Sequence, residues 1–227
     1  MRAVPRPAIL GSIAAVLFLA CVAPEDRGTD ATNLRDPWAI RAEPGDPALA
    51  AGKEIFASCA SCHLADAGGR SDGTIPRLAG QRAEILEWRL RGLQDGSIDL
   101  PVMTPFARAL TEAEIRQVSA YLASLPRPER IGSASGGVNE RGAKLYHDRC
   151  RSCHSAEADA VAASNAPRLC GQHEAYLLRR LEDMASGNAG GAGAARAVDP
   201  AMEAIAIALS MEDRLRVSRY LARSECD

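Results

Sequence analysis

Apolar residues recur at helical spacing through most of the chain after residue 45. Between residues 81 and 95, three leucines stand at i, i+4 and i+7, which places them on one face of a helix. A second apolar face runs from residue 115 to 125, directly after Thr111-Glu112-Ala113-Glu114, a capping box that marks a helix start. Asp46-Pro47 opens an earlier helix, because aspartate caps helices well and proline suits the first helical position. The pattern returns around Leu181, so both halves of the chain are predicted to contain helices.

The chain contains an internal repeat whose unit is a whole domain. Cys59-Ala60-Ser61-Cys62-His63 returns 91 residues later as Cys150-Arg151-Ser152-Cys153-His154. Thirteen residues after each histidine begins the segment Pro-Arg-Leu-x-Gly-Gln. Met103 and Met202, 99 residues apart, each precede a helix that ends in Tyr-Leu-Ala. The second half has therefore gained eight residues between Gln172 and Met202, and a repeat of this length is not a solenoid turn.

The two pentads predict covalent haem attachment. Cys-x-x-Cys-His is the attachment sequence of a c-type haem. On a helix, positions i, i+3 and i+4 share one face, so Cys59 and Cys62 can reach the porphyrin edge while His63 turns under the iron. A zinc site or a thioredoxin-like redox couple also uses Cys-x-x-Cys. Neither requires the following histidine or explains the shared downstream segments, so haem attachment is the favoured interpretation.

Two tandem Cys-x-x-Cys-His domains, each with the Pro-Arg-Leu-x-Gly-Gln segment and a methionine ahead of a Tyr-Leu-Ala helix, resemble the dihaem cytochrome c4 family. The resemblance runs from about Ala48 to Ala222. It implies an all-α fold of two class I cytochrome c domains related by pseudo-twofold symmetry, each around one covalently attached haem. The implied cofactors are two haem c groups, whose propionate edges face each other across the interface.

The resemblance also implies how each haem is held. The thioether anchors are Cys59, Cys62, Cys150 and Cys153. The axial ligands of the iron are His63 and Met103 in the first half, and His154 and Met202 in the second. The residues that match a proline beside the proximal histidine are Pro76 and Pro167, and those that match positions near the propionates are Arg77 and Arg168.

The methionines and the remaining histidines can also be judged from the residues themselves. Of the five methionines, only Met103 and Met202 recur at equivalent places, in predicted loops. A methionine is more often a core residue, but a matched pair in both repeats favours iron ligation. His147 and His173 have no histidine counterpart in the first repeat, and both are predicted to lie at the surface.

The N-terminal residues suggest export. Residues 1–20 combine two arginines with an apolar run too short to span a membrane, as in a signal peptide. Leu17 to Cys21 resembles a bacterial lipobox, which predicts a lipid anchor at Cys21 and a periplasmic, membrane-attached protein. Ordinary cleavage nearby, with Cys21 incidental, is the alternative. The predicted parts are the signal peptide 1–20, a tether 21–45, a first cytochrome c domain 46–126, a linker 127–137 and a second domain 138–227.

Charge and composition disfavour one class of function and bear on stability. The formal net charge is −2 and neither half is strongly basic or acidic, which disfavours nucleic-acid binding. Aromatic residues make up only 4% of the chain, so each small domain is expected to need the buried porphyrin as part of its core. Outside the pentads, Cys170 and Cys226 are candidates for a disulfide in an oxidising compartment. The sequence does not give the distance between them in space, which decides whether the bond can form.

Histidine and methionine ligation leaves no open position on the iron, which suits electron transfer rather than substrate chemistry. The chain is therefore predicted to be a periplasmic electron carrier and not an enzyme. The resemblance suggests a terminal oxidase, a quinol-oxidising complex or a dehydrogenase as partners. The alternative is a dihaem enzyme or a haem subunit, peroxidase-like or dehydrogenase-associated, with a labile ligand; Met202 is the candidate because the insertion precedes it. A gas or redox sensor would likewise need an open iron.

Overall fold

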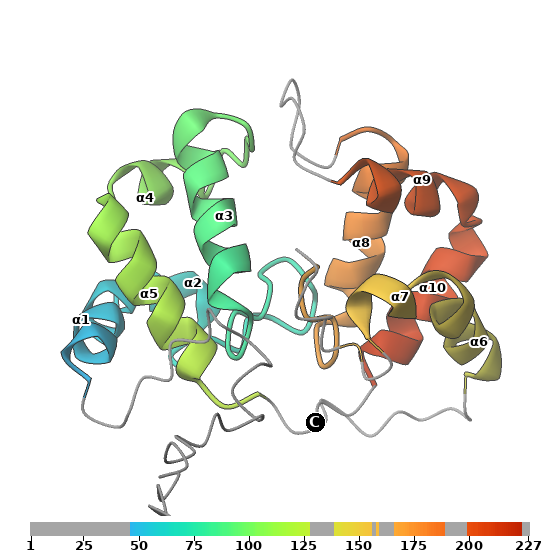
Figure 1. The fold of residues 1–227 in the computed structure, drawn as a ribbon, viewed down its shortest axis with the longest axis horizontal. Coiled ribbons are helices and arrows are strands. Elements are labelled where there is room, and N and C mark those ends of the chain that lie inside the picture. The colour runs from blue at the N-terminus through green and yellow to red at the C-terminus, as the bar shows by residue number, and fades with distance from the viewer. Residues whose placement is uncertain (1–45, 128–138, 156–157, 159–165, 189–198, 224–227) are drawn as a thin grey trace, which may run out of the picture. The chain divides into compact units, whose positions relative to one another are not determined.

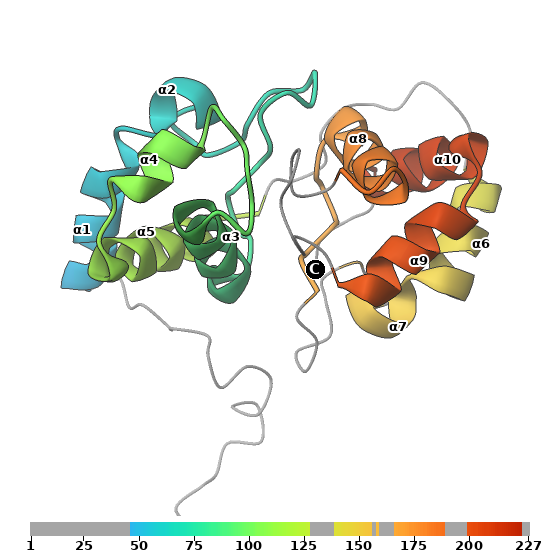
Figure 2. The same ribbon diagram turned by 90° about the horizontal axis from the view of Figure 1, so that it is seen from above.

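The computed structural model describes residues 46–127, 139–155, 158, 166–188 and 199–223, and every secondary-structure element in these ranges is a helix. Each half of the repeat contributes five helices in the same order (Figures 1 and 2). The helices of the first half are α1 (Pro47–Phe56), α2 (Ala60–His63), α3 (Ala83–Asp95), α4 (Thr104–Arg108) and α5 (Glu112–Ser124). Those of the second half are α6 (Glu140–Arg149), α7 (Arg151–His154), α8 (Glu174–Ala185), α9 (Pro200–Ala208) and α10 (Met211–Leu221). The predicted all-α fold is confirmed.

Several predictions fall on residues that the structure does not describe. The signal peptide, the lipid anchor at Cys21 and the tether all lie before residue 46, and most of the linker lies between residues 128 and 137. Cys226 is also outside the described residues. Among the helices that are described, none combines the length and the apolar character that crossing a membrane requires.

Two helices start where their capping residues predict. The Asp46 carboxylate accepts a hydrogen bond from the Ala48 amide at 2.8 Å, and Pro47 occupies the first helical position of α1. Thr111 and Glu114 form the complete capping box of α5. The Thr111 hydroxyl accepts from the Glu114 amide at 3.3 Å, and the Glu114 carboxylate accepts from the Thr111 amide at 2.7 Å. Each cap satisfies backbone amides that the first turn of a helix leaves without partners.

The first and last helices of each half pack closely because a glycine lies between them. α1 contacts α5, and α6 contacts α10. A Cβ atom at Gly52 would lie 2.2 Å from the carbonyl oxygen of Gln117, and one at Gly142 would lie 2.5 Å from that of Arg216. No side chain fits at either position without moving the helices apart.

An aromatic pair adjoins each of these helix contacts. The rings of Phe56 and Tyr121 have centroids 5.9 Å apart, and those of Tyr146 and Tyr220 are 5.6 Å apart. Phe56 and Tyr146 are separated by 90 residues, one fewer than the separation of the pentads. The second half therefore has one more residue between this aromatic side chain and the first cysteine of its pentad.

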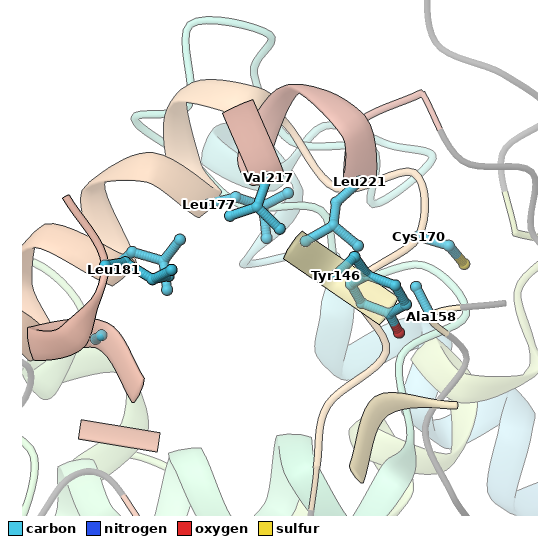
Figure 3. Packing of buried hydrophobic residues seen from close by; sticks show 9 residues of the cluster. Tyr146, Ala158, Cys170, Leu177, Leu181, Val217 and Leu221 are labelled. Atoms are coloured by element: carbon cyan, nitrogen blue, oxygen red, sulfur yellow. The ribbon is translucent and has the colours of Figure 1, made fainter. Parts of the chain in front are cut away.

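Each half has apolar cores of its own, and these cores are small. The buried members in the first half are Phe56, Ala67, Ala79, Leu86, Val118 and Leu122, with a second cluster of Leu93, Ile98 and Ala107. Those in the second half are Tyr146, Ala158, Cys170, Leu177, Leu181, Ala206, Leu209, Val217 and Leu221 (Figure 3). Alanine recurs in all three clusters, so the described side chains supply little of the apolar mass that a domain of this size needs.

Candidate functional site

Each Cys-x-x-Cys-His pentad forms one helical turn, α2 in the first half and α7 in the second. The amide of His63 donates to the carbonyl of Cys59 at 3.0 Å, and that of His154 donates to the carbonyl of Cys150 at 3.0 Å. None of the four pentad cysteines forms a disulfide; Cys153 is exposed and the others are half-buried. Burial raises the pKa of the Cys150 thiol to about 11. Each turn thus presents two thiol groups and one imidazole, the set that thioether attachment and iron ligation use.

The two pentad histidines are buried and held by proline carbonyls. His63 Nδ1 lies 3.1 Å from the carbonyl oxygen of Pro76, and His154 Nδ1 lies 2.9 Å from that of Pro167. A carbonyl oxygen only accepts, so Nδ1 carries the proton and Nε2 keeps its lone pair. Burial lowers the pKa of both imidazoles, more than the proline hydrogen bonds raise it. A neutral imidazole with a free Nε2 fits an iron ligand.

Strained backbone follows each histidine. Leu64 has φ 67° and ψ 161°, and Ser155 has φ 65° and ψ 174°, a region almost reserved for glycine. Ala67 and Ala158 have φ values of 55° and 59°. Residues at 64 and 155, and at 67 and 158, are equivalent in the repeat. The same strain in both halves marks the turn after the histidine as a feature that the site requires.

The two candidate methionine ligands lie in different local structures. Met103 immediately precedes α4, is half-buried and packs against the cluster of Leu93, Ile98 and Ala107. Met202 is also half-buried, but it lies in the first turn of α9 rather than in the predicted loop. The helix starts early because Asp199 accepts a hydrogen bond from the Ala201 amide at 2.8 Å and proline follows it.

The last residue of the repeated segment joins the two halves. The side-chain amide of Gln81 donates to the carbonyl of Arg168 at 3.0 Å and accepts from its amide at 2.9 Å. Gln172 makes the same two contacts with the backbone of Arg77, both at 3.0 Å. Each glutamine therefore pairs with the peptide groups of the opposite half. No role was predicted for these glutamines, although they recur at the same place in both segments.

The residue after each glutamine also crosses to the other half. Arg82 Nη1 donates to the carbonyl of Ala166 at 3.2 Å, and His173 Nε2 lies 2.8 Å from the carbonyl oxygen of Gly68. The prediction that His173 lies at the surface is wrong, since only 6% of it is exposed. It is equivalent to Arg82 in the repeat and takes over the same interdomain role. His147 is exposed, as predicted.

A pocket at this junction has the charge of an anion site. Arg77, Arg127 and Arg168 line it, and none of the described lining residues is acidic. Burial lowers the pKa of Arg77, and its buried Nε has no hydrogen-bond partner among the described residues. Such a pocket fits the carboxylates of a haem. Cys170 also lines the pocket and is disulfide-bonded. Its predicted pairing with Cys226 involves a residue that is not described.

Acidification is expected to destabilise the protein through His173. Burial holds the pKa of His173 below its ordinary value of 6.5, and nearby Arg77 lowers it further, although the Gly68 hydrogen bond and Asp72 act in the opposite direction. The unfolded chain then binds the proton first. The contribution of His173 to the free energy of unfolding is fully present above about pH 6.5. It is lost as the pH drops through the lowered pKa, by up to about 1.4 kcal/mol per pH unit.

Chemical unfolding of the haem-loaded protein from about pH 7.5 to about pH 5 measures this loss. His173→Gln keeps a neutral donor for Gly68 and is expected to flatten the pH dependence. His147→Gln, at an exposed position, should leave it unchanged. Equal slopes for the wild type and His173→Gln would contradict the expectation.

This chain is similar to known proteins in both sequence and structure. The family model described as Cytochrome c matches residues 49–126 and again residues 139–225. Cytochrome c4 of Thiocapsa roseopersicina is 30% identical over 78% of this chain and 92% of that protein, and cytochrome c4 of Pseudomonas aeruginosa is 29% identical over 76% and 86%. A thiosulfate dehydrogenase electron acceptor of Stutzerimonas stutzeri is 34% identical over 73% and 78%. The crystal structure of reduced recombinant cytochrome c4 from Pseudomonas stutzeri superposes with a TM-score of 0.67, at 26% identity, over 78% of this chain and 98% of that one.

Proposed function

Since this chain belongs to the cytochrome c4 family of dihaem cytochromes, we propose that His63 and Met103 hold the iron of one haem c and that His154 and Met202 hold the other. The chain is an electron-transfer protein with two covalently attached haem c groups.

The main support for the proposal is the fixed orientation of the pentad histidine in each half. A buried, neutral histidine that donates Nδ1–H to a proline carbonyl can turn only Nε2 towards a metal, and two cysteines outside disulfides precede it on the same helical turn. When bound, a c-type haem supplies an iron that takes up and releases one electron. The cysteines fix the porphyrin edge, the histidines set the basicity of the ligand, and the arginines of the interdomain pocket balance the carboxylates.

The relatives support candidate partners. Two of them are named as electron acceptors of thiosulfate dehydrogenase, and two others as the FixP subunit of a cbb3-type cytochrome c oxidase. We infer that the chain works in the periplasm, takes electrons from a dehydrogenase or a quinol-oxidising complex, and passes them to a terminal oxidase. Cys21 would attach it to the membrane surface as a lipoprotein.

A second candidate function is a haem subunit of an enzyme with one labile axial ligand. Met202, in the second half, is the better candidate for the labile ligand. It lies on a short helix after the eight extra residues, whereas Met103 lies in a loop. A carrier needs the methionine to stay on the iron, whereas an enzyme needs it to leave.

Carbon monoxide separates the two functions. It is added to the reduced, fully haem-loaded protein while the visible spectrum is recorded. A carrier with both methionines in place should show no change. Rapid binding at one haem would contradict the proposal and favour the enzyme subunit.

A further inference from the structure

Tyr146 is the largest fully buried side chain of the described residues, and its hydroxyl reaches the backbone behind the second-half histidine. The hydroxyl lies 3.0 Å from the carbonyl oxygen of His154 and 2.6 Å from that of Ser155. Both acceptors are carbonyls, so the tyrosine is the donor and the two oxygens share its one proton. Figure 3 shows the ring among Leu221 and Ala158, with the phenolic oxygen at its outer end. The ring packing fixes where the hydroxyl points.

The Tyr146 hydroxyl binds the strained backbone at Ser155. Ser155 has φ 65° and ψ 174°, a conformation that a residue with a Cβ keeps only under constraint. His154 lies between two anchors: its Nδ1 bonds to Pro167, and its carbonyl bonds to Tyr146. The hydroxyl therefore fixes the main-chain end of the same residue whose ring the proline orients.

The first half has no such hydroxyl, because Phe56 occupies the equivalent position. There the carbonyl of His63 accepts from the Gly69 amide at 3.0 Å, and that of Leu64 accepts from the Ala67 amide at 3.0 Å. The two histidines thus have the same proline contact but differ in how their main chain is held. This difference is independent of the methionines.

We propose that Tyr146 is a positioning residue for His154 and lowers the reduction potential of the second-half haem. The proposal rests on the proposed function, since it takes His154 as an iron ligand. Holding the carbonyl end of His154 keeps its Nδ1–H on the Pro167 oxygen. That hydrogen bond makes the imidazole a more basic ligand, which favours oxidised iron.

Tyr146→Phe tests the role in the full, haem-loaded chain. A redox titration should resolve two one-electron steps, assigned to the halves by NMR contacts between each haem and its own residues. We expect the second-half potential to rise, the first-half potential to stay, and the His154 Nδ1 proton to exchange faster. Tyr176→Phe removes a hydroxyl from a half-buried tyrosine of the same half, whose ring contacts Arg179, and should change neither potential.

Unchanged potentials, equal shifts in both halves or a fall in the second half would each overturn the proposal. If Tyr146→Phe does not accumulate as a folded dihaem protein, it is combined with Ser155→Gly, which relieves the strained backbone. A second-half potential equal to that of Ser155→Gly alone would then overturn it. The proposed function fails separately, through carbon monoxide binding by the wild type.

Discussion

A chain in which Cys59, Cys62, Cys150 and Cys153 are all alanine is expected to retain little native helicity. A domain of about 80 residues gains only about 3–5 kcal/mol from its core. The cores here are poor even by that standard, since Phe56 is the one aromatic residue among the buried members of the first-half clusters. Against this gain stand Leu64 and Ser155, whose strained backbone costs on the order of 1–3 kcal/mol each. The stability of either half without its porphyrin is therefore close to zero.

Far-ultraviolet circular dichroism and thermal unfolding check this expectation. The matched control replaces Ser61 and Ser152, which are exposed members of the same pentads, by alanine. This control should load both haems and unfold cooperatively like the wild type. Native helicity in the four-cysteine variant would show that the protein folds without attached haem.

Replacing a ligand methionine is the second large change. Met103→Ala or Met202→Ala should lower the reduction potential of the haem in the same half by on the order of 0.1 V, since axial ligands set haem potentials over a range of about 0.8 V. The thioether favours Fe(II) and fills the sixth position. Its loss should also allow the reduced protein to bind carbon monoxide at that haem, with the other haem unchanged.

Other methionines of the chain provide the controls. Met184 packs against the second-half core from α8, so Met184→Ala removes an apolar side chain of the same size without touching the proposed ligand set. Met211 is 57% exposed, and Met211→Ala should be silent. A carbon monoxide response of Met202→Ala that matches that of Met184→Ala would exclude Met202 as a ligand.

Local sequence signals predicted the elements they control directly. The capping box at residue 111 and the aspartate–proline pair at residue 46 begin helices because their hydrogen bonds lie within four residues. The pentads form single helical turns for the same reason. The leucine pattern predicted a helix from residue 81, but α3 starts at Ala83 because the backbone of Arg82 is extended, with φ −60° and ψ 134°.

Features that depend on distant contacts were not predictable. His173 looked like a surface residue, since nothing near it in sequence shows that Gly68, 105 residues away, faces it. The helical position of Met202 depends on the capping residue Asp199, where the first repeat has Leu100, which cannot cap a helix with its side chain. The hydroxyl of Tyr146 has a partner only after the chain has folded. In each case comparing the two repeats position by position marks the site, but its role appears only in three dimensions.

The paired glutamines have a consequence for how such a chain can arise. Gln81 makes the same pair of hydrogen bonds to Arg168 as Gln172 makes to Arg77, so each repeat offers the other the same donor and acceptor. A contact of this kind is isologous, the kind that two identical subunits make in a symmetric dimer. These four hydrogen bonds are therefore ones that two identical copies of the repeat would make with each other. Because both copies lie in one chain, this contact does not depend on protein concentration and the halves can differ, as His173 and Arg82 do.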